Sequence, residues 1–245
     1  MATVTNQPMN LKPMSGAPLP QGLAYLTQID QLIIKQKVEL LEVLTGCETR
    51  NKYEIFNSLN QQIFYAEEES SFCMRYWCGP NRGFIIHITD NDGQEVMTLN
   101  REFKCCAGCC WCADACCGFL LRVEAPPGNV VGYCKQRTSC CALHMDLMDA
   151  AMQPLFKIWG PCCPCQCICC PSDINFPVKD INNPDKVHAN IAKMWAGALR
   201  EMFTDADTFG VTFPLEMDVK QKATIIGAVF LLEFIVFETQ KNNNQ

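Results

Sequence analysis

The sequence lacks the short patterns that mark most catalytic sites. It has no Gly-x-Ser-x-Gly nucleophile turn, no phosphate-binding P-loop, no His-Glu-x-x-His zinc motif and no glycine-rich dinucleotide turn. Histidine is scarce as well, because the chain has only His87, His144 and His188. Asp146 follows His144 at the spacing of one strand face, so we interpret the pair as strand residues rather than a proton relay. We therefore expect that the protein is not an enzyme.

Positive charge is also in short supply. The chain has 20 Lys and Arg residues against 26 Asp and Glu residues, which gives a net charge of −6. This balance disfavours electrostatic capture of nucleic acid, and equally a polybasic attachment to anionic lipid. Residues 1–10 contain neither the basic start nor the apolar run of a secretory signal, so we expect the body of the protein in the cytosol.

Cysteine, by contrast, is abundant, with 19 residues that fall mostly into two clusters. In a reducing compartment, clustered thiols are acylation sites, metal ligands or small buried apolar groups. Both clusters contain Cys-x-x-Cys pairs of the kind that bind zinc, but their adjacent cysteines exceed what one zinc site needs. These alternatives stay open. The clusters are Cys105, Cys106, Cys109, Cys110, Cys112, Cys116 and Cys117, and Cys162, Cys163, Cys165, Cys167, Cys169 and Cys170.

Short β-type runs separated by turn residues fill most of the chain. The clearest hairpin signal is Asp90-Asn91-Asp92-Gly93 between two apolar runs. Many short strands at such spacing indicate a barrel or a sandwich. A short amphipathic helix is expected at residues 38–44, with Gly46 near its end. The predicted strands cover residues 32–34, 53–56, 63–65, 84–89, 95–99, 119–123, 130–135, 143–147, 155–159, 174–178 and 209–217.

A long apolar segment stands near the end of the chain. Asp218 is placed to cap a helix, and residues 223–237 are apolar except for Thr224 and Glu233. Fifteen helical residues span roughly 22 Å, short of the ~30 Å hydrocarbon core of a bilayer. A carboxylate at Glu233 makes a membrane span costlier still. We favour a helix buried in the protein over a membrane span. The residues expected to be buried are Ile226, Val229, Phe230 and Phe234.

Four stretches together resemble the phospholipid scramblase family. They are LTQIDQLIIKQKVELLEVLTGCETRNKYEIFN, EAPPGNVVGYCKQ, GPCCPCQCICC and FTDADTFGVTFPLEMDVKQKA, the last followed by IIGAVFLLEFIVFE. The resemblance implies a mainly β fold: a closed, roughly twelve-stranded antiparallel barrel that encloses a hydrophobic C-terminal α-helix at about residues 219–238, similar to the tubby-like fold. The barrel domain would cover residues 23–239, between disordered tails at 1–22 and 240–245. At residues 187–202, where periodicity favours a helix, the family pattern instead favours a strand followed by a helical turn.

The resemblance also implies a function. Members are associated with calcium-dependent, ATP-independent, bidirectional movement of phospholipids between membrane leaflets, here at the cytoplasmic face of the plasma membrane. The partners would be phospholipids, a membrane and, as an open option, further copies of the chain, with no nucleic acid. The alternative is a membrane-associated lipid-binding or adaptor module of the tubby-like kind that moves no lipid. The first cysteine cluster matches the family's palmitoylated segment, which implies acylation at Cys109, Cys110, Cys112, Cys116 and Cys117.

A calcium site is expected ahead of the C-terminal helix. Asp205, Asp207 and Glu216 fall at the first, third and twelfth places of an EF-hand loop, and Gly210 falls at the sixth. The family assigns calcium binding to this same segment, and Asp218 is close enough in sequence to contribute. The fifth place holds a phenylalanine, which has no oxygen ligand, so the competing interpretation is a solvated turn followed by a strand.

Overall fold

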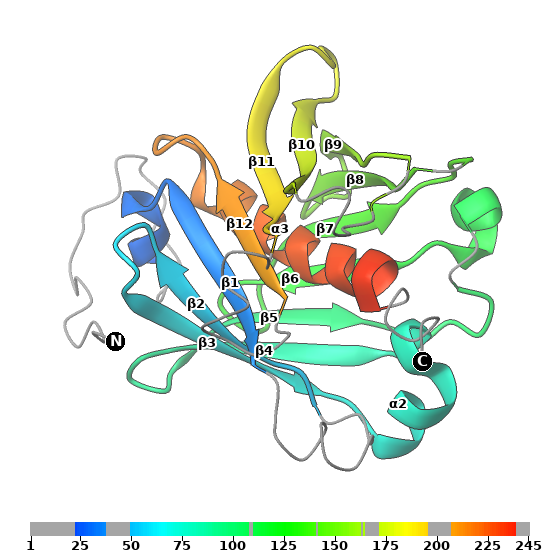
Figure 1. Ribbon diagram of the computed structural model, residues 1–245, viewed down its shortest axis with the longest axis horizontal. Coiled ribbons are helices and arrows are strands. Elements are labelled where there is room, and N and C mark those ends of the chain that lie inside the picture. The colour runs from blue at the N-terminus through cyan, green and yellow to red at the C-terminus, as the bar shows by residue number, and fades with distance from the viewer. Residues whose placement is uncertain are drawn as a thin grey trace.

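The chain folds into one closed barrel of twelve antiparallel strands, which confirms the predicted architecture (Figure 1). The structure, a computed structural model, describes residues 23–37, 50–107, 110–140, 142–162, 164, 172–195 and 207–238. Each strand pairs with the next along the chain, and β12 returns to pair with β1. The strands are β1 (Gln31–Lys37), β2 (Lys52–Asn57), β3 (Gln62–Glu69), β4 (Phe84–Asp90), β5 (Glu95–Arg101), β6 (Leu120–Glu124), β7 (Val130–Gln136), β8 (His144–Asp149), β9 (Pro154–Trp159), β10 (Ile174–Asp180), β11 (Val187–Lys193) and β12 (Thr208–Thr212).

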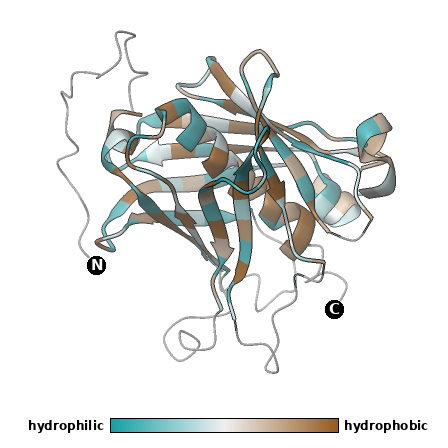
Figure 2. Cartoon of the chain, turned by 90° about the horizontal axis from the view of Figure 1, so that it is seen from above, coloured by the Kyte–Doolittle hydropathy of each residue, from teal (hydrophilic) through white to brown (hydrophobic). Residues whose placement is uncertain are grey.

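Alternation of apolar and polar residues produces these strands. In β4, Phe84, Ile86 and Ile88 are buried while the residues between them are only half-buried. A strand turns successive side chains to opposite faces, so this pattern points one set into the barrel and the other outward. The alternating colours along the strands of Figure 2 show the same division. The predicted hairpin forms between β4 and β5, where Gly93 adopts a positive φ of 78°.

Of two further strand predictions, one is confirmed and the other is too long. The start of residues 187–202 is a strand, β11, as the family pattern indicated. The predicted strand at 209–217 is too long, because β12 ends at Thr212. Burial alternates as far as Phe213, but the backbone then turns at Pro214, whose carbonyl accepts a bond from the Met217 amide at 3.1 Å. Proline has no backbone N–H to donate to a neighbouring strand, so the strand ends here. The alternation of buried and exposed residues therefore extends slightly further than the strand itself.

Some expectations lie outside the described residues. The helix expected at 38–44, both predicted tails and Asp205 are among them. So is most of the second cysteine cluster, of which only Cys162 is described, as an exposed residue. These expectations stay predictions.

The C-terminal apolar segment is a helix enclosed by the barrel. Helix α3 (Val219–Leu232) continues into a π-helical segment, Glu233–Glu238, and lies inside the ring of strands (Figure 1). The Asp218 carboxylate caps it by accepting bonds from the amides of Lys220 and Gln221 at 2.9 and 3.3 Å. Among the described residues, no helix has the length and apolarity to cross a bilayer. The four residues expected to be buried are all buried: Ile226, Val229, Phe230 and Phe234.

Glycine lets the helix approach the barrel wall closely. A Cβ on Gly132 of β7 would lie 2.3 Å from Oγ1 of Thr224 on α3. A Cβ on Gly227 of α3 would lie 2.6 Å from a methyl of Val123 on β6. Both distances are shorter than atoms can approach, so a larger residue at either position would push the helix off the wall.

Lys222 is the buried charge near the start of α3. Its Nζ donates to the backbone carbonyls of Leu26, Ile29 and Leu215 at 3.0, 2.8 and 2.8 Å. Burial lowers the pKa of Lys222 below its usual value, since a charged amine is less stable away from water. Three carbonyl acceptors match the three N–H groups of the ammonium. The helix is thereby tied to two chain segments outside it.

Strand order places the connections at two ends of the barrel. In an antiparallel meander, alternate connections lie at the same end. One end has the short turns at residues 58–61, 91–94, 125–129, 150–153 and 181–186. The other, which we call the long-loop end, has the connections 38–51, 70–83, 102–119, 137–143, 160–173 and 194–207. Both cysteine clusters, Asp205 and Asp207 therefore belong to connections at the long-loop end, where α3 also finishes.

The enclosed helix generates the first prediction. Phe230 is fully buried, and its ring packs edge-on against Tyr53 with 5.0 Å between centroids. Phe230→Ala removes this packing and leaves a cavity, so the free energy of unfolding should fall by about 3 to 5 kcal/mol in a denaturant titration. Leu59→Ala is the control, since Leu59 is 75% exposed and its loss should change stability by less than about 0.5 kcal/mol. A loss below about 1 kcal/mol for Phe230→Ala would contradict enclosure.

Candidate functional site

The connection between β5 and β6 is fixed to the barrel by contacts that involve no thiol. It contains a π-helical turn, Ala113–Cys117. The amide of Asp114 donates to Thr138 Oγ1 at 3.0 Å, and its carboxylate pairs with Arg137 Nε at 2.9 Å. Lys104 Nζ donates to the Gly118 carbonyl at 2.9 Å, which ties the beginning of the connection to its end. Asp114 therefore forms the anchor to the residues that follow β7.

Three thiols, those of Cys106, Cys116 and Cys117, converge on this segment. The Sγ atoms of Cys106 and Cys116 are 3.9 Å apart, and those of Cys116 and Cys117 are 3.5 Å apart. Hydrogen bonds with Cys112 and Cys116 raise the pKa of the Cys117 thiol above its usual value. Cys106 lies 10 residues before Cys116. Cys106 belongs to the first cysteine cluster of the sequence, but spacing alone did not indicate that its sulfur would lie beside that of Cys116.

The predicted acyl acceptors differ in accessibility. Cys116 is exposed, Cys112 is half-buried and Cys117 is buried. The Cys109 residue and the Cys110 side chain lie outside what the structure describes. Acyl transfer needs an accessible sulfur with thiolate character, so burial and a raised pKa make Cys117 the poorest acceptor of the described three.

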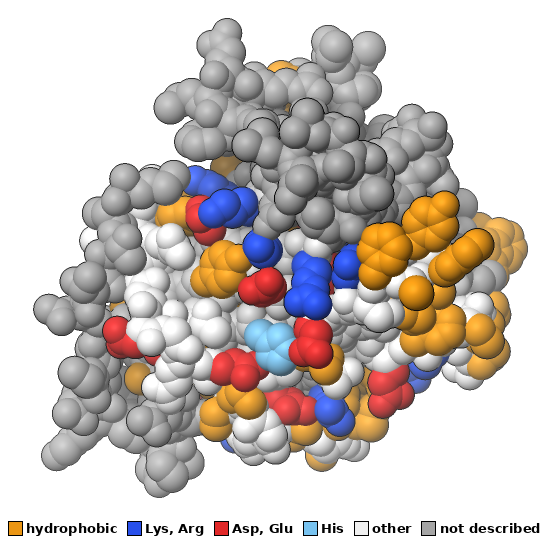
Figure 3. All heavy atoms as spheres, turned by 90° about the horizontal axis from the view of Figure 1, so that it is seen from below, with side chains coloured by type: hydrophobic (Ala, Val, Ile, Leu, Met, Phe, Trp, Pro, Cys, Tyr) orange, Lys and Arg blue, Asp and Glu red, His pale blue; other side chains and the backbone are white. Residues whose placement is uncertain are grey.

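Exposed aromatic side chains gather at the same end of the barrel. Helix α2 (Phe72–Cys78) begins at Ser71, whose hydroxyl accepts from the Met74 amide at 3.2 Å. Its residues Phe72, Tyr76 and Trp77 are exposed, and Trp77 is 80% exposed. In the view of Figure 3, hydrophobic side chains collect toward one end of the face. All the exposed large aromatics among the described residues belong to the long-loop end: Phe72, Tyr76, Trp77, Phe103, Trp111 and Trp159.

Sequence reasoning missed this aromatic surface. Helix α2 is too short for a periodicity signal, and the aromatics lie in connections far apart along the chain. The available signal was local: three aromatics within the seven residues of α2. Large apolar side chains with polar tips prefer a boundary between water and an apolar phase.

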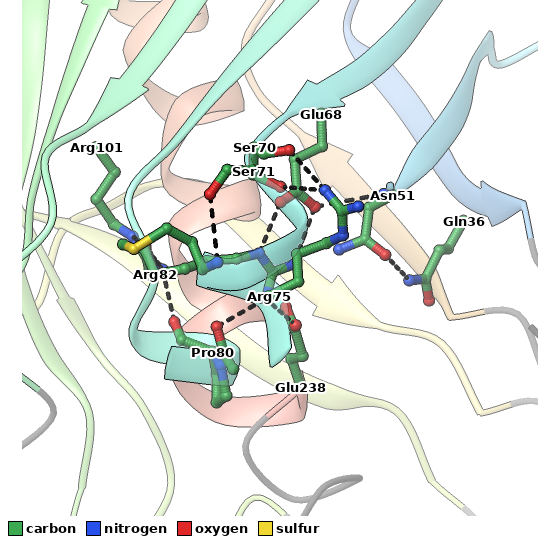
Figure 4. Close-up of polar contacts among 12 residues, drawn as sticks. Gln36, Asn51, Glu68, Ser70, Ser71, Arg75, Pro80, Arg82, Arg101 and Glu238 are labelled. Atoms are coloured by element: carbon green, nitrogen blue, oxygen red, sulfur yellow. Dashed lines mark hydrogen bonds and ion pairs between the residues drawn. The ribbon is translucent and has the colours of Figure 1, made fainter. Parts of the chain in front are cut away.

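A buried ion-pair network lies beneath α2 (Figure 4). Arg82 donates to the Glu68 carboxylate through two bonds, from Nε at 2.6 Å and from Nη2 at 2.9 Å. Its Nη1 bonds Glu238 at the end of the enclosed helix. Burial alone would raise the pKa of Glu68, but the bonds and charge of Arg82 hold it below its usual value. The network joins β3, the turn after α2 and the helix end.

Arg101 extends the same network into the aromatic core. Its Nη2 donates to the Arg82 carbonyl at 2.6 Å and also to the Pro80 carbonyl. Its guanidinium lies 4.3 Å from the ring centroid of Phe84 and 5.0 Å from that of Phe234. Cation–π contacts of this kind are strongest away from water. Arg101 therefore links the barrel wall to the enclosed helix.

A small pocket opens on the outer face of β5, β6 and β7. Its volume is about 150 Å³, below the range of about 300 to 1,000 Å³ typical of small-molecule sites. It holds charges of both signs, since Glu102, Lys104 and Arg122 line it. A site of this size does not enclose a phospholipid.

The structure does not bring the described members of the predicted calcium set together. Asp207 precedes β12, whereas Glu216 and Asp218 follow it, and five strand residues span roughly 16 Å. The Asp207 carboxylate pairs with Lys193 Nζ at 2.9 Å, and Asp218 caps α3. Glu216 is exposed. One ion cannot contact Asp207 and also Glu216 or Asp218, so Asp207 does not share a site with those two carboxylates.

Comparison with known proteins assigns the family. The family described as Scramblase matches residues 7–239. Phospholipid scramblase 1 of Rattus norvegicus is 47% identical over 226 residues, which cover 92% of this chain and 65% of the rat protein. Phospholipid scramblase 2 of Bos taurus is 45% identical over 234 residues, 96% of this chain and 77% of the bovine protein. Phospholipid scramblase family member 5 of Homo sapiens is 44% identical over 220 residues, 90% of this chain and 78% of the human protein.

This chain thus spans about two thirds of the rat relative's length. No solved structure matches it. The match at 7–239 includes every strand of the barrel and the whole enclosed helix. The chain belongs to the scramblase family.

Proposed function

We propose that the protein moves phospholipids in both directions between the leaflets of a membrane, without ATP and in response to calcium. It acts at the cytoplasmic face of the plasma membrane, with its long-loop end toward the bilayer. The relatives are named for phospholipid scrambling, and this chain includes their family domain. Lipid movement is transport and breaks no bond.

The observation that carries this proposal is the aromatic surface at the long-loop end. Six exposed aromatics share one end of the barrel, three in the connection 70–83, two in the connection 102–119 and one, Trp159, as the last residue of β9. Aromatic side chains are enriched where proteins meet the headgroup region of a bilayer. The opposite end exposes isolated aliphatic side chains, Leu59, Met152, Val187 and Leu215, but no large aromatic among the described residues. This asymmetry supports one orientation on a membrane.

Acylation at the same end would make the contact lasting. One acyl chain holds a protein only marginally, whereas two or more give stable anchoring. Cys116 is exposed and Cys112 is half-buried, and both lie on the connection that also exposes Trp111. Chains attached there would enter the lipid beside the aromatic side chains. With a net charge of −6, electrostatic attraction to anionic lipid cannot replace the acyl chains as an anchor.

The calcium part of the proposal rests on Asp205 and Asp207. Both lie in the connection between β11 and β12, at the end we place against the membrane. Two carboxylates without a full loop would bind calcium weakly, with a dissociation constant on the order of 10⁻⁴ to 10⁻³ M. Asp207 is paired with Lys193, so Asp205 is the more informative residue to change.

The second candidate function is a lipid-binding adaptor that moves no lipid. The observation in its favour is the filled interior, since α3 and its continuation occupy the barrel and leave their residues buried. An adaptor would use the aromatic surface and acyl chains for attachment alone. Transport assays separate the two functions.

Reconstituted vesicles test lipid movement and its calcium dependence. The purified chain should make fluorescently labelled inner-leaflet lipid accessible to a membrane-impermeant quencher, faster with millimolar calcium than without it. Asp205→Ala should abolish the calcium increment. Asp185→Ala is the control: it removes the same charge from an exposed position at the opposite end and should change nothing. A calcium response that survives Asp205→Ala would refute the assigned site, and the absence of any lipid movement would favour the adaptor.

Vesicle sedimentation tests the orientation. The unacylated chain should bind vesicles through its aromatic end, and Tyr76→Ser with Trp77→Ser should weaken binding by about tenfold or more, because burial of one large apolar side chain contributes about 1.5 to 3 kcal/mol. Leu59→Ser, an equally exposed site at the other end, should bind like the parent. Equal weakening in both variants would contradict the orientation.

Fractionation of cells tests anchoring. Replacing Cys109, Cys110, Cys112 and Cys116 by Ser should shift most of the protein to the soluble fraction, because the remaining aromatic contact is weaker than acyl anchors. Cys117 is kept because it is buried. The matched control is Cys73→Ser, an exposed thiol outside the cluster, which should stay on membranes. Membrane retention that resists both the replacement and hydroxylamine would exclude thioester anchoring.

A further inference from the structure

The thiols between β5 and β6 are arranged as a group around one point. The Sγ atoms of Cys106, Cys116 and Cys117 all lie within 4.8 Å of one another. Cys112 lies outside this group of three, but its thiol hydrogen-bonds that of Cys117, which makes it the candidate for a fourth ligand. We call these four residues the thiol cluster. Within the part of the chain that the structure describes, no other group of three His, Cys, Asp or Glu residues converges in this way.

The sulfur separations match the dimensions of a zinc site. A Zn–S bond is about 2.3 Å, so the sulfurs of a tetrahedral site are about 3.8 Å apart. The observed separations are 3.9 Å for Cys106 to Cys116 and 3.5 Å for Cys116 to Cys117. Small side-chain rotations are therefore enough to bring the sulfurs of Cys106, Cys116 and Cys117 around an ion, and the Cys112 sulfur must move closer to complete the tetrahedron.

The backbone that carries the thiols is already held in place. Asp114 is fixed by Thr138 and Arg137, and Lys104 bonds the Gly118 carbonyl. The Gly118 amide also closes the π-helical turn on the Ala113 carbonyl at 3.0 Å. A metal ion would not have to order residues 113–118, which lowers the entropic cost of binding. The charge of Lys104 offsets part of the negative charge of a tetrathiolate site, whereas Arg137 is already paired with Asp114 and Asp146.

We propose that Cys106, Cys112, Cys116 and Cys117 bind one zinc ion through four thiolates. Each thiol releases its proton to solvent as its sulfur coordinates the ion, and no electron is transferred. Soft thiolate ligands select zinc over the hard cations calcium and magnesium. The site is distinct from any calcium site, and it does not depend on lipid movement.

Zinc and acylation compete for the same sulfur atoms. A thioester at Cys112 or Cys116 removes a thiolate that the ion requires, and a bound ion occupies the sulfur that an acyl group would need. Cys106 is not among the predicted acyl acceptors. A substitution of Cys106 should therefore impair zinc binding without removing an acylation site. Zinc therefore stabilises the chain in its unacylated form.

The test uses the full chain produced without acyltransferases and kept reduced. Cobalt(II), which replaces zinc in such sites, should give intense thiolate-to-metal absorption and tetrahedral visible bands, and zinc should displace it. Cys106→Ser should weaken zinc affinity at this site by at least about 100-fold, since loss of a hydrogen bond to a zinc ligand alone weakens binding by about 10 to 100-fold. The control is Cys105→Ser, which changes the neighbouring exposed thiol and should bind like the parent.

A measurement on the unaltered chain keeps the test independent of variant folding. Zinc should protect Cys106, Cys112, Cys116 and Cys117 from alkylation, mapped by mass spectrometry, while Cys73 and Cys140 remain reactive. Alkylation of Cys106 and Cys116 at the same rate with and without zinc would overturn the proposal, as would metal binding unchanged in Cys106→Ser. Acylation and membrane attachment should persist in Cys106→Ser in cells, so the loss of zinc and the loss of anchoring are separate results.

Discussion

The enclosed helix is held at its two ends by buried charges that have partners. Lys222 donates to three backbone carbonyls near the short-turn end, and Arg82 joins Glu238 to Glu68 at the long-loop end. A buried charge without a partner costs several kcal/mol, so the helix cannot slide along the barrel without a large penalty. Between these two ends the helix packs directly against the barrel wall, because glycines on both sides leave room for close contact. The position of the helix along the barrel axis is therefore fixed.

The same constraint positions the exterior of the long-loop end. Arg82 follows α2 directly and Glu68 precedes it, so the ion pair closes the base of the segment that carries Tyr76 and Trp77. Arg75 within α2 donates to the Ser70 carbonyl at 2.6 Å, which adds a second tie. The backbone of α2, which carries Phe72, Tyr76 and Trp77, thus stands on a rigid base and does not need to be ordered when it meets a membrane.

The sequence was informative where one physical signal dominated. Period-two alternation predicted most strands, and the apolar run with Asp218 at its head predicted an enclosed helix. Alternation predicted too long a strand at β12, because Phe213 is still buried one residue past the end of the strand and Pro214 then turns the backbone. The first cysteine cluster was predicted as a group, with metal binding as one alternative, but which of its sulfurs converge depends on how the connection folds back on itself. The aromatic surface was beyond reach for a different reason, since it depends on which connections share an end of the barrel. Strand order, which fixes that sharing, is a property of the closed fold.

The filled interior also limits how such a protein can act on lipid. A phospholipid that changes leaflet must carry its polar headgroup past hydrocarbon, and a protein helps by offering that headgroup polar partners or water. The barrel interior offers no such path, because its buried charges already bind protein groups, as Lys222 binds backbone carbonyls and Arg82 binds Glu68. The apolar side chains of the helix fill the remaining space against the wall. Any route for the headgroup must therefore lie outside the barrel. The long-loop end is where apolar and acylated groups would enter one leaflet, so a bilayer disturbed around that end, rather than a channel through the fold, is the physical route consistent with this architecture.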